Sequence, residues 1–280
     1  MIRRMAVVFM LAFEFGSLAD PSLSQTKSTT TPNTTLLDRL FLVRRPDFIE
    51  NCFGTPKADA VIVFRSKTPD STISIQVLTR SGTVVSASVA ETLVLDTCEE
   101  FEYQSVSYGL LHAQAPLGWN SEIDALIGVQ AATINPQRVG TVSPLSEAAM
   151  KSKCLSVISL AIPDSEHCDI KTQMQFNAPG GKPQFLLVSV DRYVEKNVLL
   201  AGDKAVYPTG FVFTVENGNP RLLFAENYLS RVFSISDLDN DGIYEVAVYS
   251  GGWGEGSYEV RLFDGKVFLK DKRVLYHWMD

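Results

Sequence analysis

Residue types that hold transition metals are scarce in this sequence of 280 residues. It contains three histidines and four cysteines. No two cysteines form a Cys-x-x-Cys pair, and His112, His167 and His277 are far apart in the chain. Tetrahedral zinc sites are built from closely spaced Cys and His ligands. The sequence therefore predicts no Cys/His zinc site, and we interpret His167 beside Cys168 as a loop neighbour.

Catalytic motifs are absent as well. The sequence has no Gly-x-Ser-x-Gly nucleophile elbow, no His-Glu-x-x-His metalloprotease motif and no phosphate-binding P-loop. The glycine-rich run Gly251–Gly256 lies between predicted strands, where it cannot present a helix N-terminus to a phosphate, so we interpret it as a hairpin turn. The acidic residues Glu99, Glu100 and Glu102 could supply a glycosidase-like carboxylate pair, but such a charge run is typical of a solvated face. These absences favour a protein that is not an enzyme.

No apolar run reaches the roughly 20 residues that a membrane-spanning helix needs. At the N-terminus two arginines precede the short apolar run Met5–Phe13, and small residues follow, which is typical of a secretory signal. We predict a signal peptide over residues 1–24 and a flexible Ser/Thr-rich linker over residues 25–35, with an uncleaved N-terminal anchor as the alternative. Residues 36–280 are then the β part of a secreted or periplasmic protein.

The net charge of −7 is unfavourable for polyanionic partners. Nucleic acids and anionic membranes bind basic patches or stripes, and the sequence shows none. We therefore expect no nucleic acid and no membrane as a partner, apart from the possible N-terminal anchor. An unidentified protein or glycan is left as the expected partner.

The even number of cysteines suits disulfide bonds in an exported protein. Four cysteines allow three pairings. We favour the close pair Cys154 and Cys168, which leaves Cys52 with Cys98.

Short β-branched and aromatic runs separated by turn residues dominate the sequence after Cys52. Thr72–Leu78 alternates apolar and polar residues, and Ser81-Gly82 then turns the chain into the next run, which is typical of a β-hairpin. Only Ser146–Lys153 has a helical pattern. The sequence therefore predicts a mainly β fold.

One acidic stretch, Asp237–Glu245, is the most specific feature of the chain. Its sequence is Asp-Leu-Asp-Asn-Asp-Gly-Ile-Tyr-Glu, so acidic residues take positions one, three, five and nine. Glycine at position six allows a sharp turn, and position seven can offer its backbone carbonyl. Acidic side chains this close repel one another unless a cation lies between them. The order of residues is that of a calcium-binding loop.

Position twelve distinguishes two kinds of calcium loop. An EF-hand has a bidentate Glu there and helices on both sides. Here the position holds Val248, and the flanking segments Arg231–Ser236 and Val246–Tyr249 are β-branched and aromatic without helical spacing. The loop is therefore predicted to join two strands.

A strand, this loop, a second strand, a glycine-rich turn and a third strand together resemble the FG-GAP or VCBS-type calcium repeat of integrin-alpha-like β-propellers. The resemblance covers roughly residues 231–270. It implies that one Ca²⁺ ion is bound by the side chains of Asp237, Asp239, Asp241 and Glu245 and by the backbone carbonyl of Ile243.

Apolar strands opened by a polar turn recur about every 60 residues. They are Lys57–Val63, Glu122–Gly128, Lys182–Val188 and Ile243–Val248. In the family that the loop resembles, this spacing corresponds to one four-stranded blade, so we expect a degenerate β-propeller-like array of antiparallel hairpins. The alternatives are a β-sandwich, or two small β domains with a boundary near residues 140–170.

Together these features predict an exported, non-catalytic binding or adhesion-type protein with a structural Ca²⁺ ion in its C-terminal repeat. Two other classes stay open. One is an exported, glycosidase-like hydrolase that carries a calcium-stabilised β domain, and the other is an envelope structural protein without a small ligand.

Overall fold

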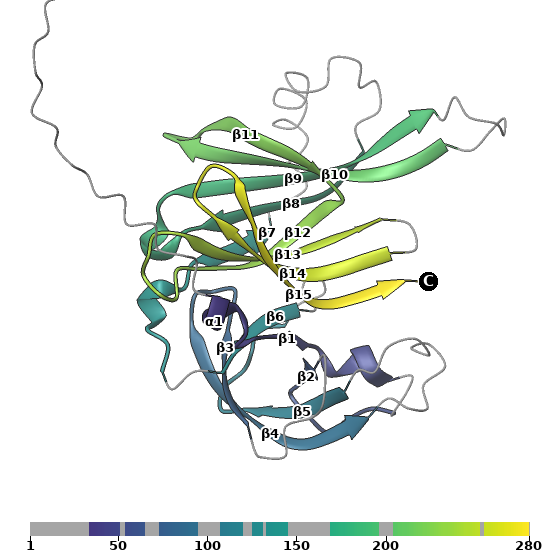
Figure 1. Ribbon diagram of the computed structural model, residues 1–280, viewed down its shortest axis with the longest axis vertical. Coiled ribbons are helices and arrows are strands. Elements are labelled where there is room, and N and C mark those ends of the chain that lie inside the picture. The colour runs from purple at the N-terminus through teal and green to yellow at the C-terminus, as the bar shows by residue number, and fades with distance from the viewer. Residues whose placement is uncertain are drawn as a thin grey trace, which may run out of the picture. The chain divides into compact units, whose positions relative to one another are not determined.

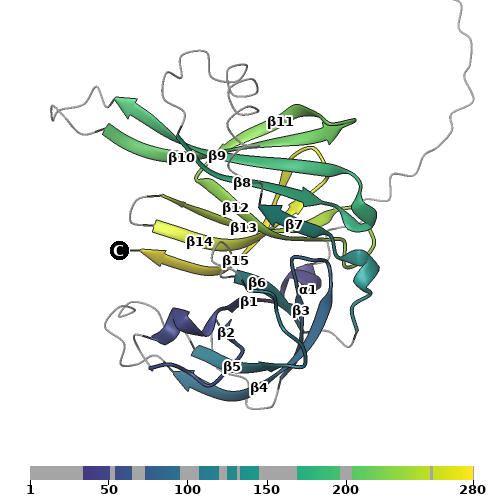
Figure 2. The same ribbon diagram turned by 180° about the vertical axis from the view of Figure 1, so that it is seen from behind.

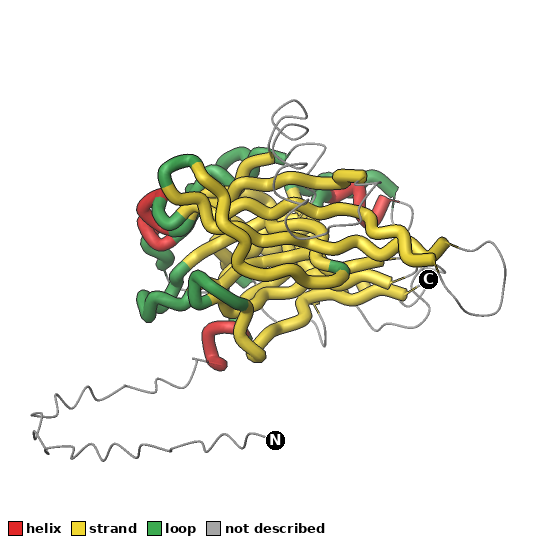
Figure 3. The backbone as a smooth tube through the Cα atoms, turned by 90° about the horizontal axis from the view of Figure 1, so that it is seen from above, coloured by secondary structure: helices red, strands yellow, loops and turns green. Residues whose placement is uncertain are grey.

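Antiparallel β-strands make up most of the part of the chain that the structure describes, as the yellow segments of Figure 3 show. The structure is a computed structural model. It describes residues 34–50, 54–64, 73–94, 107–119, 125–130, 133–144, 169–195, 204–252 and 255–279. The mainly β prediction is confirmed. Within these ranges no helix is long and apolar enough to cross a bilayer.

Several predictions lie outside the described residues. They concern the signal peptide over residues 1–24, the four cysteines, the acidic run at Glu99, Glu100 and Glu102, and the helix at Ser146–Lys153.

The N-terminal strands form a closed barrel in the order β1-β2-β5-β4-β3-β6 (Figure 1). Its strands are β1 (Leu40–Arg44), β2 (Ala60–Phe64), β3 (Ser74–Leu78), β4 (Val84–Val94), β5 (Ser107–Ala113) and β6 (Ala125–Val129). The helical turns α1 (Thr34–Leu37) and η1 (Pro46–Ile49) flank β1. Because β6 pairs with both β1 and β3, no strand of the barrel keeps an unpaired edge.

The interior of this barrel has little room, and two glycines face it. A Cβ atom at Gly109 would lie 2.7 Å from the Ile62 side chain, and one at Gly128 would lie 2.9 Å from the Ile75 side chain. Both isoleucines belong to the hydrophobic cluster that fills the barrel. A closed sheet of few strands has an interior just wide enough for packed side chains, so glycine admits the large neighbours here.

Gly109→Ala is therefore expected to destabilise the protein by about 1–2 kcal/mol, because the added methyl group overpacks the barrel. Urea unfolding followed by circular dichroism measures the change. Ser88→Ala, at an exposed position of β4, is the control and should leave the unfolding midpoint unchanged. Equal stability of the two variants would contradict the tight packing around Gly109.

The C-terminal strands form two sheets. The five-stranded sheet has the order β11-β10-β9-β8-β7, and the four-stranded sheet has the order β12-β13-β14-β15. The first contains β7 (Thr141–Pro144), β8 (Asp169–Asn177), β9 (Gln184–Glu195), β10 (Lys204–Glu216) and β11 (Asn219–Asn227). The second contains β12 (Leu229–Ser236), β13 (Tyr244–Gly252), β14 (Glu255–Phe263) and β15 (Phe268–Met279). The turns η3 (Pro136–Arg138) and η4 (Pro179–Gly181) precede β7 and β9.

These two sheets pack face to face as a β-sandwich. The ring of Phe185 on β9 lies 5.0 Å, centroid to centroid, from that of Phe263 on β14. Phe224 on β11 lies 5.2 Å from Phe268 on β15 in the same measure. Edge-to-face aromatic contacts of this kind stabilise a core beyond the area that they bury.

The four-stranded sheet lies between the five-stranded sheet and the barrel, as Figures 1 and 2 show from opposite sides. The face of the four-stranded sheet that is turned away from the five-stranded sheet contacts the outside of the barrel. The Arg44 guanidinium lies 4.9 Å from the Tyr258 ring centroid, and the ring centroids of Phe48 and Tyr276 are 5.8 Å apart. One hydrophobic cluster contains residues of the barrel and of both sheets. All of them belong to one compact unit, Asn33–Asp280.

The described strands do not divide into four equivalent blades, so the prediction of a propeller-like array is wrong. The recurring apolar segments fall on β2 and β6 of the barrel, on β9 of the five-stranded sheet and on β13 of the four-stranded sheet. Each is an interior strand covered on both faces, and such strands are apolar along their length in any β fold. The sandwich alternative describes the C-terminal sheets. The chain leaves the barrel at Val129 and enters the sandwich at Thr141, next to the predicted boundary near residues 140–170.

Candidate metal site

The acidic stretch joins β12 to β13, so the predicted strand-loop-strand arrangement is present. Two residues of the loop have left-handed backbone conformations, Asn240 with φ 63° and Gly242 with φ 84°. Asn tolerates this region better than most residues, and glycine adopts it without steric penalty. The Asp241 carboxylate accepts a hydrogen bond from the Ile243 backbone N–H at 2.7 Å, which closes the turn.

Three of the predicted ligands are brought together by this turn. Carboxylate oxygens of Asp237, Asp239 and Asp241 all lie within 4.8 Å of one another. A Ca²⁺ ion binds oxygen at about 2.3–2.6 Å, so one ion can contact oxygens up to about 5 Å apart. Burial, and then the Asp241 charge, raise the pKa of Asp239 above its ordinary value. The cluster therefore has the spacing of a cation site and is electrostatically unfavourable without a cation.

Asp237 is the buried member of the group. It is only 7% exposed, and among the described residues its Oδ1 atom is buried without a hydrogen-bond partner. The other oxygen, Oδ2, lies 3.7 Å from Nη1 of Arg138. A buried carboxylate oxygen without a partner loses its hydration and gains nothing in return. A bound cation would supply the missing contact.

Glu245, the fourth predicted side-chain ligand, lies outside this group of three. Its Oε2 atom accepts hydrogen bonds from the Leu238 backbone N–H at 3.0 Å and from the Ser236 hydroxyl at 3.3 Å. Burial raises the pKa of Glu245 to about 8. In this structure Glu245 therefore holds the beginning of the loop against β13. The Ile243 N–H faces Asp241, and its carbonyl as a ligand stays a prediction.

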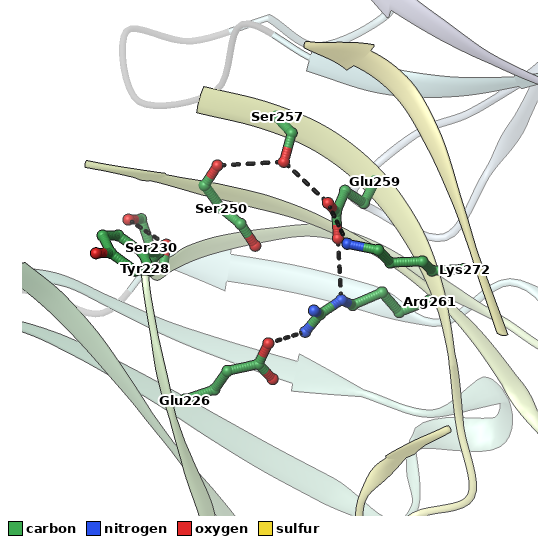
Figure 4. A network of polar contacts seen from close by, with 8 residues as sticks. All are labelled: Glu226, Tyr228, Ser230, Ser250, Ser257, Glu259, Arg261 and Lys272. Carbon is green, nitrogen blue, oxygen red and sulfur yellow. Dashed lines mark hydrogen bonds and ion pairs between the residues drawn. The ribbon is translucent and has the colours of Figure 1, made fainter. Parts of the chain in front are cut away.

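A second polar cluster lies between the sheets of the sandwich, and its role is different (Figure 4). Glu259 on β14 accepts hydrogen bonds from Lys272 Nζ at 2.8 Å and from Arg261 Nε at 3.1 Å. Arg261 also pairs with Glu226 on β11, in the facing sheet. Two acids and two bases balance one another here. This network therefore has no excess charge for an ion to neutralise, whereas the Asp237 loop does.

Neither the contact of Arg138 with the loop nor this network could be predicted from the sequence. Arg138 lies on η3 and reaches the loop only through the fold. Comparisons of the chain with family models, with curated proteins and with solved structures gave no match. The candidate site therefore rests on its own residues and geometry.

Proposed function

We propose that this chain binds Ca²⁺ as a structural ion in the loop Asp237–Glu245, and that it serves outside the cytoplasm as a non-catalytic binding or adhesion-type protein. The observation that carries the calcium proposal is the buried, unpartnered Oδ1 atom of Asp237 beside the carboxylates of Asp239 and Asp241. The export signal predicted at residues 1–24 supports the location.

The donor set favours calcium over other metals. It consists of carboxylate oxygens, which suit hard cations, and the described cluster contains no thiolate or imidazole that would select zinc or copper. Ca²⁺ tolerates irregular oxygen geometry, whereas Mg²⁺ requires a near-ideal octahedron at shorter distances. An irregular hairpin loop with alternating aspartates therefore suits calcium better than magnesium.

The ion would act by joining the ends of β12 and β13. Without it, the three aspartates repel one another, and with it they share one positive centre. Extracellular calcium modules bind in the range of about 10⁻⁴–10⁻³ M. An exported protein of this kind would keep its loop ordered at the calcium concentrations outside cells.

Calcium is expected to raise the melting temperature of the protein. At an ion concentration about ten times the dissociation constant, the folded state gains about 1.4 kcal/mol, which corresponds to a rise of about 3–6 °C. Asp241→Asn should lose most of this rise, because it removes one of the negative charges that bind the ion. The asparagine keeps a side-chain oxygen that can accept the Ile243 hydrogen bond, so the turn itself should be preserved. Differential scanning calorimetry in EDTA and in millimolar CaCl₂ measures both.

The matched control is Asp264→Asn in the turn between β14 and β15. Asp264 also accepts backbone hydrogen bonds within its turn, from the N–H groups of Lys266 and Val267. It is not part of the acidic group, so this variant should keep the full calcium response. Identical melting curves of the wild type in EDTA and in calcium would refute the proposed site.

A further inference from the structure

Residues 133–144, which lead from the barrel through η3 into β7 of the sandwich, are here called the connector. It is held against the calcium loop by backbone hydrogen bonds. The Gly140 N–H donates to the Ile235 carbonyl at 2.8 Å, and the Asp237 N–H donates to the Arg138 carbonyl at 2.9 Å. The backbone of the buried aspartate is therefore positioned by the connector and not only by its own strands.

The connector also contacts the barrel. The Val142 N–H donates to the Arg80 carbonyl at 2.9 Å, in the turn between β3 and β4. The Asn135 side chain accepts a hydrogen bond from the Gln137 N–H at 3.0 Å and so caps η3, the turn that carries Arg138. Arg138 therefore lies on a segment that is hydrogen-bonded both to the barrel and to the end of β12.

The contact between Arg138 and Asp237 has the character of a charge interaction. Its length of 3.7 Å exceeds that of a hydrogen bond, and the Arg138 side chain is 34% exposed. The guanidinium therefore does not orient the carboxylate. Its effect is a positive charge next to the innermost aspartate, whose position the Arg138 backbone carbonyl already fixes.

We propose that Arg138 sets the calcium affinity of the loop. This inference rests on the calcium site proposed above. In the ion-free loop the guanidinium offsets part of the repulsion among Asp237, Asp239 and Asp241. Once Ca²⁺ binds, the same positive charge repels the ion. Arg138 thus stabilises the empty loop, weakens ion binding and shifts the response of the site to higher calcium concentrations.

Arg138→Gln should bind Ca²⁺ about tenfold more tightly than the wild type, the size expected for removing one positive charge several ångströms from a divalent ion in a water-like dielectric. The difference should shrink at higher salt, because the guanidinium is partly exposed and screened. Arg138→Lys keeps the charge and should keep an affinity close to that of the wild type.

Isothermal titration of the folded chain with CaCl₂ tests this, with Arg45→Gln as the control. Arg45 has a similar exposed fraction, 36%, and pairs with Asp47 at 2.9 Å, but it lies next to η1 and not beside the acidic loop. Arg45→Gln should bind calcium as the wild type does. No calcium binding by the wild type would refute the site itself. Wild-type binding together with unchanged or weaker binding by Arg138→Gln would refute only the role of Arg138.

Melting curves of the same proteins provide a second readout. In EDTA, Arg138→Gln should melt below the wild type, because the empty acidic loop loses its counter-charge. In saturating calcium this difference should narrow or reverse. A difference of the same size in both conditions would mean that Arg138 only supports the fold, and would overturn the inference.

Discussion

Glu259→Gln is expected to lower the free energy of unfolding by about 2–4 kcal/mol at pH 7, somewhat less than the loss of a fully buried ion-pair partner because Lys272 is partly exposed. Glu259 is only 3% exposed. Its carboxylate accepts hydrogen bonds from the side chains of Lys272, Arg261 and Ser257. Glutamine has nearly the same size but no negative charge, so Arg261 would keep Glu226 as its one remaining ion-pair partner in this network. Urea unfolding measures the loss.

The effect should depend on pH in a defined direction. Burial alone would raise the pKa of Glu259, but the Lys272 and Ser257 hydrogen bonds and the Arg261 charge outweigh it and hold the pKa below its ordinary value of 4.5. A lowered folded-state pKa means that this contribution to stability is complete above that ordinary value and is lost as the pH falls through the folded-state pKa. The gap between wild type and Glu259→Gln should therefore be largest near neutral pH and shrink in acid.

Glu216→Gln is the control for this prediction. Glu216 pairs with Arg221 at 3.6 Å, and both side chains are about 70% exposed. Surface pairs of this kind contribute little, roughly 0–1 kcal/mol. If Glu259→Gln were no more destabilising than Glu216→Gln, the network between the sheets would have no role in holding the sandwich together.

The strands could be predicted because their signals are local. Of the predicted run Thr72–Leu78, residues Ser74–Leu78 form β3. The Ser81-Gly82 turn leads into β4, which pairs antiparallel with β3, with Leu78 opposite Val84. The grouping of strands into a barrel and a sandwich could not be predicted in this way. Strands β2 and β9 are both apolar and paired on both sides, although β2 belongs to a closed barrel and β9 lies in an open sheet.

In the candidate site, too, the local features could be predicted from the sequence and the contacts between distant segments could not. The three aspartates share one loop, so the motif itself predicts that they lie together, and the structure confirms this proximity. Arg138 comes from a distant segment, and no pattern marks it. Glu259 and Arg261 alternate with apolar residues along β14, which is typical of a strand with one solvated face. That face is covered by β11, and sequence alternation does not show whether another sheet covers a polar face.

Gly140→Ala is expected to destabilise the protein by about 3 kcal/mol, at the upper end of the range for overpacking. A Cβ atom at this position would lie 2.1 Å from the backbone oxygen of Asn177 and 2.7 Å from the Ile235 side chain. The φ angle of Gly140 is one that alanine can adopt, so lack of space is the cause. Asn177 is fixed by pairing with Thr141 and Gln184, and it cannot move without disturbing both ladders.

The connector has to move instead, and this links the prediction to the loop Asp237–Glu245, where we propose the calcium site. Displacing it would break the Gly140 to Ile235 hydrogen bond and withdraw the Arg138 carbonyl from the Asp237 N–H. Amide hydrogen exchange at Gly140 and Asp237 should then become faster, while Gln137→Ala, at an exposed position of the same connector, should leave both rates unchanged. Wild-type stability and exchange in Gly140→Ala would show that the connector is not held against β12, and the placement of Arg138 beside Asp237 would lose its support.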